Sequence, residues 1–315
     1  SLKCAPLAIS SGTVSGTLVI APAAQSITFN AIPGVTFGNP PFALSASATS
    51  GLPVAFSIVS GPATIAGNTV TVTGAGTVAV RASQPGNTNF LAATPVDRSF
   101  TVGKANQSIT FAAPADATYG AAPFTVSASS SADLPVTFSV ASGPATISGN
   151  RVTFTGAGVV IVRAAQDGNA DYNAAPYLDR TFTVSRAPLV AIAQDATRVY
   201  GQPNPAFTLS YRGFVNGDTA AVLGAAPVAE TAANAASHTG TYPITVSGGA
   251  AANYAFSYVA GVLTITPAAQ TIDFAVVPNH TYGDAPFALT ATASSSLPVS
   301  FAVLSGPATV AGNVV

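Results

Sequence analysis

The sequence predicts an all-β protein built from tandem small β-sandwich domains. Good surface helix formers are nearly absent, with two Lys, one Glu and no Met in 315 residues, whereas Thr, Val, Ser, Gly and Pro abound. Apolar and hydroxyl residues alternate with a period of two, as in Phe124-Thr-Val-Ser-Ala128. Whole phrases also recur, and the strand-ending residues Ile20, Val102, Val184 and Ile265 are spaced 82, 82 and 81 residues apart.

The low charge first suggests a membrane protein, because only 7% of residues are charged while 48% are hydrophobic. No apolar run approaches the roughly 20 residues that a spanning helix needs, since Ser, Thr, Gly, Pro or Asn interrupts every stretch. Disorder is disfavoured by 17 Phe and 9 Tyr. The net charge of −1 gives no electrostatic reason to expect nucleic acid as a partner, and we expect no membrane insertion.

The repeated phrases define the expected domains. Gln25-Ser-Ile-Thr-Phe29 returns at Gln107 and, as Gln-Thr-Ile-Asp-Phe, at Gln270; the third unit replaces several phrases with its own. With no Met in view, we expect a piece of a longer chain. The predicted domains are 1–21 (the end of a preceding module), 22–103, 104–185, 186–266, and 267–315 (the N-terminal half of a further module).

Each complete unit is expected to be an immunoglobulin-like sandwich, because the second unit holds about seven short alternating strands in roughly 80 residues. Gly67-Asn68 suits a type II′ hairpin turn. The only helix candidate is Asp218–Gly224, with Asp218 as its N-cap. Linkers of about four residues, such as 266–269, predict tandem modules arranged as an elongated rod of about 120–160 Å.

Catalytic motifs are lacking, so we expect no enzyme and no cofactor. His238 and His280 lie in different repeats. Gly74-Ala-Gly-Thr-Val-Ala79 fits a dinucleotide fingerprint but leads into a strand, which indicates a tight turn. The lone Cys4 cannot form an internal disulfide.

One segment could hold a metal ion. Oxygen side chains stand at every second position of the second unit, at Asp167, Asn169, Asp171 and Asn173. Such spacing is compatible with Ca²⁺, although no bidentate Glu follows and the first unit lacks the charges. The alternative is a polar turn whose Asp and Asn bond their own backbone.

Two further features recur in phase. Phe90, Tyr172 and Tyr254 share one register and could be core plugs or a stacking series for glycans. Asp97-Arg98 and Asp179-Arg180 are neighbouring acid–base pairs that could tie a domain end or junction.

The third unit resembles the MBG domain of the Tyr-Gly type through Val199-Tyr-Gly-Gln-Pro-Asn-Pro-Ala-Phe-Thr-Leu-Ser-Tyr-Arg-Gly-Phe-Val-Asn-Gly-Asp218, Asn253-Tyr254 and Gly261-Val-Leu-Thr-Ile265. The other units resemble bacterial immunoglobulin-like repeats through Leu-Pro-Val, Ser-Gly-Pro-Ala-Thr and Gly-Ala-Gly. The resemblance implies a secreted or surface-anchored bacterial adhesin or other exoprotein, and it carries over no catalytic residue.

Two classes of function follow. The chain is expected to be a non-catalytic stalk segment of an extracellular, surface-located adhesin-like protein. Alternatively, it binds a glycan or another surface protein, with contacts expected at Tyr211, Arg212 and Phe214, which cluster in the divergent unit. Accessory domains of a secreted enzyme are a third possibility.

Overall fold

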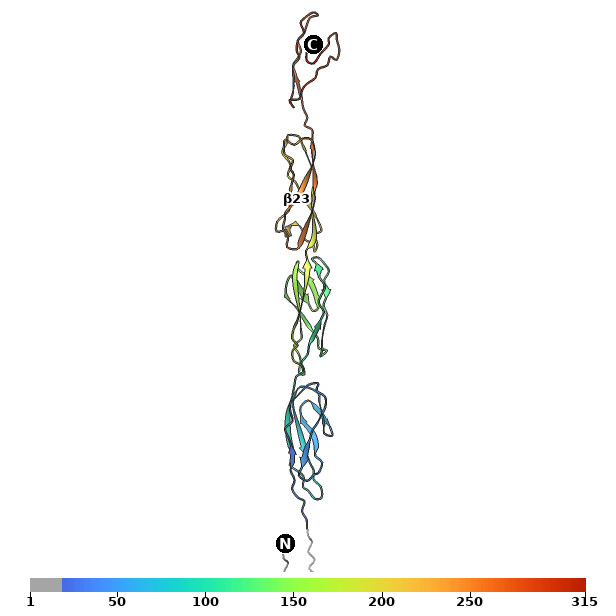
Figure 1. Ribbon diagram of the computed structural model, residues 1–315, viewed down its shortest axis with the longest axis vertical. Coiled ribbons are helices and arrows are strands. Elements are labelled where there is room, and N and C mark those ends of the chain that lie inside the picture. Colours follow the sequence, from blue (N-terminus) through green and yellow to red (C-terminus); the bar gives the residue numbers. More distant parts are fainter. Residues whose placement is uncertain (1–18) are drawn as a thin grey trace, which may run out of the picture. The chain divides into compact units, whose positions relative to one another are not determined.

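The computed structural model describes residues 19–315, so Cys4 and most of the predicted module 1–21 lie outside the described residues. The names first, second, third and fourth repeat are used below for residues 22–103, 104–185, 186–266 and 267–315. The described residues form an all-β, immunoglobulin-like chain whose only helical element is one short 3-10 turn (Figure 1). Among the described residues, no helix is long and apolar enough to cross a membrane.

The first repeat is a two-layer sandwich. One layer is a four-stranded sheet in the order β2-β9-β8-β5. The other combines the pair β1-β4 with the sheet β3-β7-β6, because β3 and β4 are two parts of one interrupted stretch. The strands are β1 (Ile27–Phe29), β2 (Val35–Thr36), β3 (Phe42–Ala43), β4 (Ala46–Ala48), β5 (Ala55–Ser60), β6 (Ala63–Ala66), β7 (Thr69–Val72), β8 (Gly76–Ser83) and β9 (Val96–Gly103).

The second repeat has the same topology, with sheets β11-β18-β17-β14, β10-β13 and β12-β16-β15. Both repeats place a register shift at the same point, after Ile58 in β5 and after Val140 in β14. Its strands are β10 (Ile109–Phe111), β11 (Ala117–Thr118), β12 (Phe124–Thr125), β13 (Ala128–Ser130), β14 (Thr137–Ser142), β15 (Ala145–Ser148), β16 (Arg151–Phe154), β17 (Gly158–Ala165) and β18 (Leu178–Ser185).

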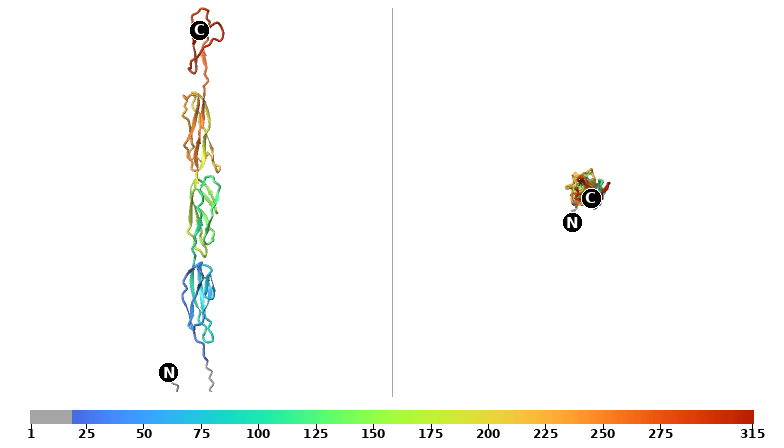
Figure 2. Two further views of the ribbon diagram at one scale, coloured as in Figure 1. Left: turned by 45° about the vertical axis from the view of Figure 1, so that its right-hand side comes forward. Right: turned by 90° about the horizontal axis from the view of Figure 1, so that it is seen from above.

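The third repeat has its own pattern of two sheets, β21-β19-β24 and β20-β25-β23-β22. Figure 2 shows its strands, in yellow to orange, running side by side along this repeat. Its strands are β19 (Ala187–Ala193), β20 (Ala196–Val199), β21 (Leu209–Arg212), β22 (Val228–Glu230), β23 (Gly240–Ser247), β24 (Tyr254–Val259) and β25 (Gly261–Thr266).

The helix predicted over Asp218–Gly224 is shorter than expected. Only the 3-10 turn η1 (Ala220–Val222) forms, and its N-cap is Thr219, whose hydroxyl accepts a bond from the Ala221 amide. Asp218 does not cap it, because its carboxylate is bound by tyrosine hydroxyls described below.

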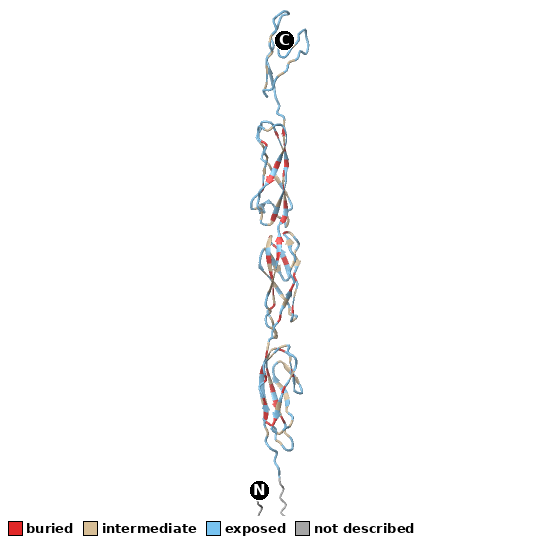
Figure 3. Ribbon diagram, in the orientation of Figure 1, coloured by how far each residue is buried: buried red, intermediate tan, exposed pale blue. Residues whose placement is uncertain are grey.

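The cores follow the predicted alternation (Figure 3). In β8, Val78, Val80 and Ala82 are fully buried, and their equivalents in β17 are as well. The predicted hairpin turn also forms between β6 and β7. Gly67 has a φ of 63° and Asn68 has a negative φ, as the two central residues of a type II′ turn require.

In the fourth repeat, β26 (Ile272–Phe274) pairs only with β27 (Ala291–Ala293). Phe274 is 49% exposed, whereas its equivalents Phe29 and Phe111 are 4% and 3% exposed. The reason is that residues 267–315 form no counterpart of β8 and β9 to cover it.

The chain divides into two compact units, and the division runs through the second repeat. One unit holds the residues up to Ala115 together with Pro123–Thr153 and Val159–Phe182. The other holds Asp116–Ala122, Phe154–Gly158 and Thr183–Val315. Each of the two junctions between successive complete repeats therefore lies inside one unit.

Candidate functional site: the junctions between repeats

Measured between strands, the linker is one residue between the second and third repeats, but five residues between the first and second and between the third and fourth, close to the four or so expected. After β18 ends at Ser185, Arg186 alone precedes β19. After β9 ends at Gly103, only Lys104 precedes Ala105, whose amide donates to the Asp171 carbonyl at 2.9 Å. The backbone therefore pairs with the next repeat after a single residue: Ala105 is bridged to Tyr172, and Ala187 to Tyr254.

A side-chain oxygen at each junction accepts a hydrogen bond from the preceding repeat. Asp171 Oδ1 accepts a hydrogen bond from the Ala75 amide at 2.7 Å, and Asn253 Oδ1 accepts one from the Ala157 amide at 2.9 Å. Both amides lie in the middle of a Gly-Ala-Gly turn, and both bonds span 96 positions of sequence. We call this bond between an Asp or Asn and the preceding repeat's turn the Asx clasp. It satisfies an amide that would otherwise be enclosed without an acceptor.

An aromatic pair accompanies each clasp. Tyr172 meets Phe37 with ring centroids 5.5 Å apart at 88°, and Tyr254 meets Tyr119 at 5.7 Å and 90°. Edge-to-face geometry is the favourable arrangement for such rings. The sequence placed Tyr172 and Tyr254 in one register, but neither interpretation of that register, as core plugs or as a stacking series, included these contacts with the preceding repeat.

The turn that presents the first ring of each pair is anchored to the last strand of its own repeat. The amide of Phe37 donates to the Gly103 carbonyl, and the amide of Tyr119 donates to the Ser185 carbonyl, both at 2.9 Å. The residues that immediately precede the linker therefore also position the ring that the next repeat covers.

The second junction adds a buried polar cluster. Asp218 Oδ2 accepts hydrogen bonds from the hydroxyls of Tyr254 at 2.7 Å and Tyr119 at 3.1 Å. The Val215 amide donates to the Tyr254 hydroxyl at 3.1 Å. Tyr254 is 1% exposed, and its burial, followed by its hydrogen bond to Asp218, raises its pKa to about 12. The phenol therefore stays protonated and able to donate across the junction.

Of the four residues proposed for Ca²⁺, Asp171 forms the first clasp and Asn169 holds the turn that contains it. Asn169 Oδ1 accepts from the amides of Asp171 and Tyr172 at 2.8 and 2.9 Å, and Lys104 Nζ donates to the Asn169 carbonyl at 2.6 Å. Within residues 19–315 no group of three or more His, Cys, Asp or Glu gathers as a metal site would require. The calcium assignment to Asp167, Asn169, Asp171 and Asn173 stays a prediction; of these, Asn173 Nδ2 donates to Asn106 Oδ1.

The structure separates the three residues proposed to contact a ligand. Phe214 packs between Tyr211 and Tyr254, with centroid distances of 5.7 and 5.2 Å. Tyr211 also packs against the core of the third repeat. Arg212 is exposed and, as the next residue of β21, points to the opposite face of the sheet. Tyr211 and Phe214 therefore lie on the side of β21 that packs toward Tyr254, whereas Arg212 lies on the opposite face.

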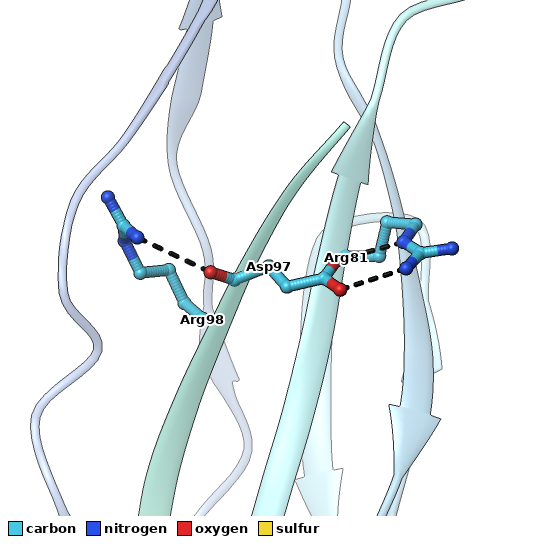
Figure 4. Close-up of polar contacts among 3 residues, drawn as sticks. All are labelled: Arg81, Asp97 and Arg98. Atoms are coloured by element: carbon cyan, nitrogen blue, oxygen red, sulfur yellow. Dashed lines mark hydrogen bonds and ion pairs between the residues drawn. The ribbon is translucent and has the colours of Figure 1, made fainter. Parts of the chain in front are cut away.

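The recurring pairs Asp97-Arg98 and Asp179-Arg180, which could tie a domain end or junction, make their side-chain contacts within their own repeats. Asp97 bonds Arg81 on the adjacent strand through two 2.8 Å contacts, and Arg98 Nη1 donates to the Asp97 backbone carbonyl at 3.3 Å (Figure 4). Arg98 Nε donates to the Phe29 carbonyl at 2.9 Å. Arg163 and Asp179 repeat the first of these contacts, and Arg180 repeats the last. Neighbouring side chains on a strand point to opposite faces of the sheet, so Asp and Arg in each pair bond residues of other strands and not each other's side chains.

Comparison with known proteins identifies one part of the chain. Residues 189–264 match the family model of the MBG domain (YGX type). No curated protein matches the chain in sequence.

Solved structures that match the chain include tandem domain arrays. They include the I-band fragment I67-I69 from titin (13% identity, 80% of this chain and 100% of that one, TM-score 0.33). Drosophila N-cadherin EC1-4 matches at 13% identity over 78% and 73% of the two chains, with a TM-score of 0.27. Sidekick-1 immunoglobulin domains 1-5 match at 11% identity over 78% and 59%, with a TM-score of 0.30.

Proposed function

We propose that this chain, which carries an MBG domain (YGX type) among immunoglobulin-like repeats, is a non-catalytic spacer segment of a secreted or surface-anchored bacterial adhesin-like protein. The observation that carries the proposal is the repetition of one junction. The same clasp and ring pair, with backbone pairing that resumes one residue after the last strand, join the first repeat to the second and the second to the third. The five-domain division given above is part of the same proposal.

The physical support is that each junction combines several restraints of different kinds. A single residue before backbone pairing resumes cannot act as a flexible tether, whose reach grows with the number of free residues. Backbone pairing at Ala105 and Ala187 fixes the incoming chain, while the Asx clasp and the ring pair act on the other side of the contact. Such restraints limit bending between neighbouring domains and favour an extended array.

Solution scattering from the whole chain tests the proposal. We expect a pair-distance distribution with a long tail, which broadens when Asp171→Ala and Asn253→Ala remove both clasps. Asn89→Ala is the matched control, because Asn89 is the equivalent residue of the first repeat and its side chain makes no hydrogen bond within residues 19–315. A compact particle, or equal broadening by the control, would contradict the spacer role.

A binding role for the third repeat is the second candidate. Its support is a shallow pocket lined by Arg186, Phe256 and Tyr258, in which the two rings stack at 13°. Arg186 has no hydrogen-bonding or ionic partner within the described residues. An acidic glycan or a protein carboxylate would suit an aromatic face beside a free guanidinium. Glycan arrays probed with the whole chain and with Tyr258→Ala test this role; equal signals would exclude the pocket.

A further inference from the structure

The third repeat carries a third copy of the turn that the first and second repeats use at their junctions. The Tyr200 amide donates to the Thr266 carbonyl at 2.9 Å, as those of Phe37 and Tyr119 do to their own last strands. The following Gly201 has a φ of 81°, against 86° for Gly38 and 90° for Gly120. The backbone of the turn is therefore the same in all three repeats.

The amide for a clasp is also in place. Gly240 opens β23 with a φ of 143°, close to 144° at Gly76 and 149° at Gly158. Thr239 consequently stands where Ala75 and Ala157 offer their amides to the Asx clasp. We call Tyr200, Gly201 and Thr239 the open junction face.

The open junction face differs from its two counterparts in being uncovered. Tyr200 is 42% exposed, whereas Tyr119 is 8% exposed beneath Tyr254. Thr239 is exposed, whereas Ala75 and Ala157 are half-buried. Among the described residues, no ring contact reaches Tyr200 and no hydrogen bond reaches the Thr239 amide.

We propose that the open junction face is a docking surface for the Asx–aromatic loop of another β-sandwich repeat of the type seen in residues 104–185. The inference rests on the proposed spacer function and names the partner of that face. Its basis is that the chain contains two occupied copies of the same face, and in both the occupant is an Asp or Asn followed by Tyr. The oxygen would accept from the Thr239 amide, and the ring would cover Tyr200.

The test extends the whole chain after Val315 with a copy of residues 153–185. Val315 pairs with Phe287 as Val152 pairs with Phe124, so the extension continues the repeat in register and supplies copies of Asp171 and Tyr172. Hydrogen exchange is then read at the Thr239 amide. We expect exchange to slow about tenfold or more, since a bond to an ionised acceptor protects the amide by that order. Nitration of Tyr200 should fall in parallel.

The matched control carries the same extension with the copies of Asp171 and Tyr172 both changed to Ala, and it should leave Thr239 and Tyr200 as accessible as in the original chain. If the extension fails to fold, residues 267–315 are replaced by a copy of 104–185, a complete repeat. Unchanged Thr239 exchange beside a folded extension, shown by protection around Phe274, would overturn the docking surface. Protection that appears in the unextended chain on raising its concentration would also overturn it, in favour of a second copy as occupant.

The two proposals fail separately. A compact scattering profile of the original chain removes the spacer role, whereas unchanged Thr239 exchange in the folded extended chain removes only the docking surface.

Discussion

Gln107 Oε1 is buried and finds no hydrogen-bond partner among residues 19–315, because Ala132 stands where the first repeat has a serine. In the first repeat, Ser50 Oγ donates to Gln25 Oε1, the equivalent oxygen. Gln107 is 5% exposed, so water cannot easily replace the missing donor. Ser50 Oγ in the first repeat also accepts from the Leu52 amide, and in the second repeat Ser130 Oγ accepts from the equivalent Leu134 amide at 2.9 Å. Ser130 does not, however, donate to Gln107.

Ala132→Ser is therefore expected to stabilise the second repeat. The new hydroxyl should donate to Gln107 Oε1 and raise the free energy of unfolding by about 1 kcal/mol, because an unsatisfied buried acceptor costs about 1–3 kcal/mol. Urea denaturation of the whole chain, followed by hydrogen exchange in β17, measures the gain. Ser50→Ala is the mirror-image control and should lower the stability of the first repeat by a similar amount. Equal stability of Ala132→Ser and the original chain would show that the acceptor is not costly.

The turn glycines give a matched set for measuring the second junction. Gly38, Gly120 and Gly201 share a positive φ, but an added Cβ meets nothing at Gly38 or Gly201 and lies 2.6 Å from a methyl carbon of Val215 at Gly120. Alanine at the first two should cost about 1–2 kcal/mol from the backbone alone. At Gly120 the clash should add about 1–3 kcal/mol. Thermal unfolding of the three single variants tests this order, and a cost at Gly120 no larger than at Gly38 would mean that the Val215 contact is loose.

The Tyr254–Asp218 contact makes the second junction sensitive to alkali. Tyr254 has a pKa of about 12 in the folded chain, above its ordinary 10.0, so folding favours the protonated phenol. Its contribution to stability is fully present below pH 10 and is lost as pH rises toward 12. Absorbance at 295 nm should show one tyrosine ionising late, and Tyr254→Phe should remove that late step. Loss of a different step in this variant would show that another tyrosine is the shifted one.

The sequence was sufficient to predict the class and much of the architecture, because those depend on local patterns. The two-residue alternation of Phe124-Thr-Val-Ser-Ala128 predicted which side chains face inward: Val126 is buried and Phe124 and Ala128 are half-buried, whereas Thr125 and Ser127 are exposed. Gly67-Asn68 likewise located a hairpin. The family assignment of the third repeat followed from residues that are consecutive in the chain, such as the Tyr200-Gly201 turn.

The junctions were less predictable because their partners lie far apart in sequence. The spacing of its neighbours makes Asp171 a candidate metal ligand, yet its oxygen accepts a hydrogen bond from an amide 96 positions earlier. Asp218 was assigned to a helix cap from its position before Ala220, but the tyrosine hydroxyls compete for the same oxygen. One signal could have revealed the contact: the Asx–aromatic pair and the Gly-Ala-Gly turn recur in phase in successive repeats.

The last prediction separates the two arginines beside Asp97. Arg81 and Asp97 form a half-exposed pair, and their hydrogen bond holds the pKa of Asp97 below 3.8, so the pair contributes above that pH and is lost as pH falls through the lower folded pKa. Arg98 instead binds the carbonyl of Phe29, a core residue of β1.

Arg98→Ala should therefore destabilise the first repeat by about 1 kcal/mol at any pH between 5 and 8, since the lost bond joins two layers of the sandwich. Arg81→Ala, the matched control on the adjacent strand β8, should leave neutral-pH stability nearly unchanged because exposed pairs are weak and screened. It should, however, shift the carboxyl titration of Asp97, followed by NMR, back toward 3.8. Equal loss of stability in the two variants would show that the Arg98–Phe29 bond has no special role in holding β9 against β1.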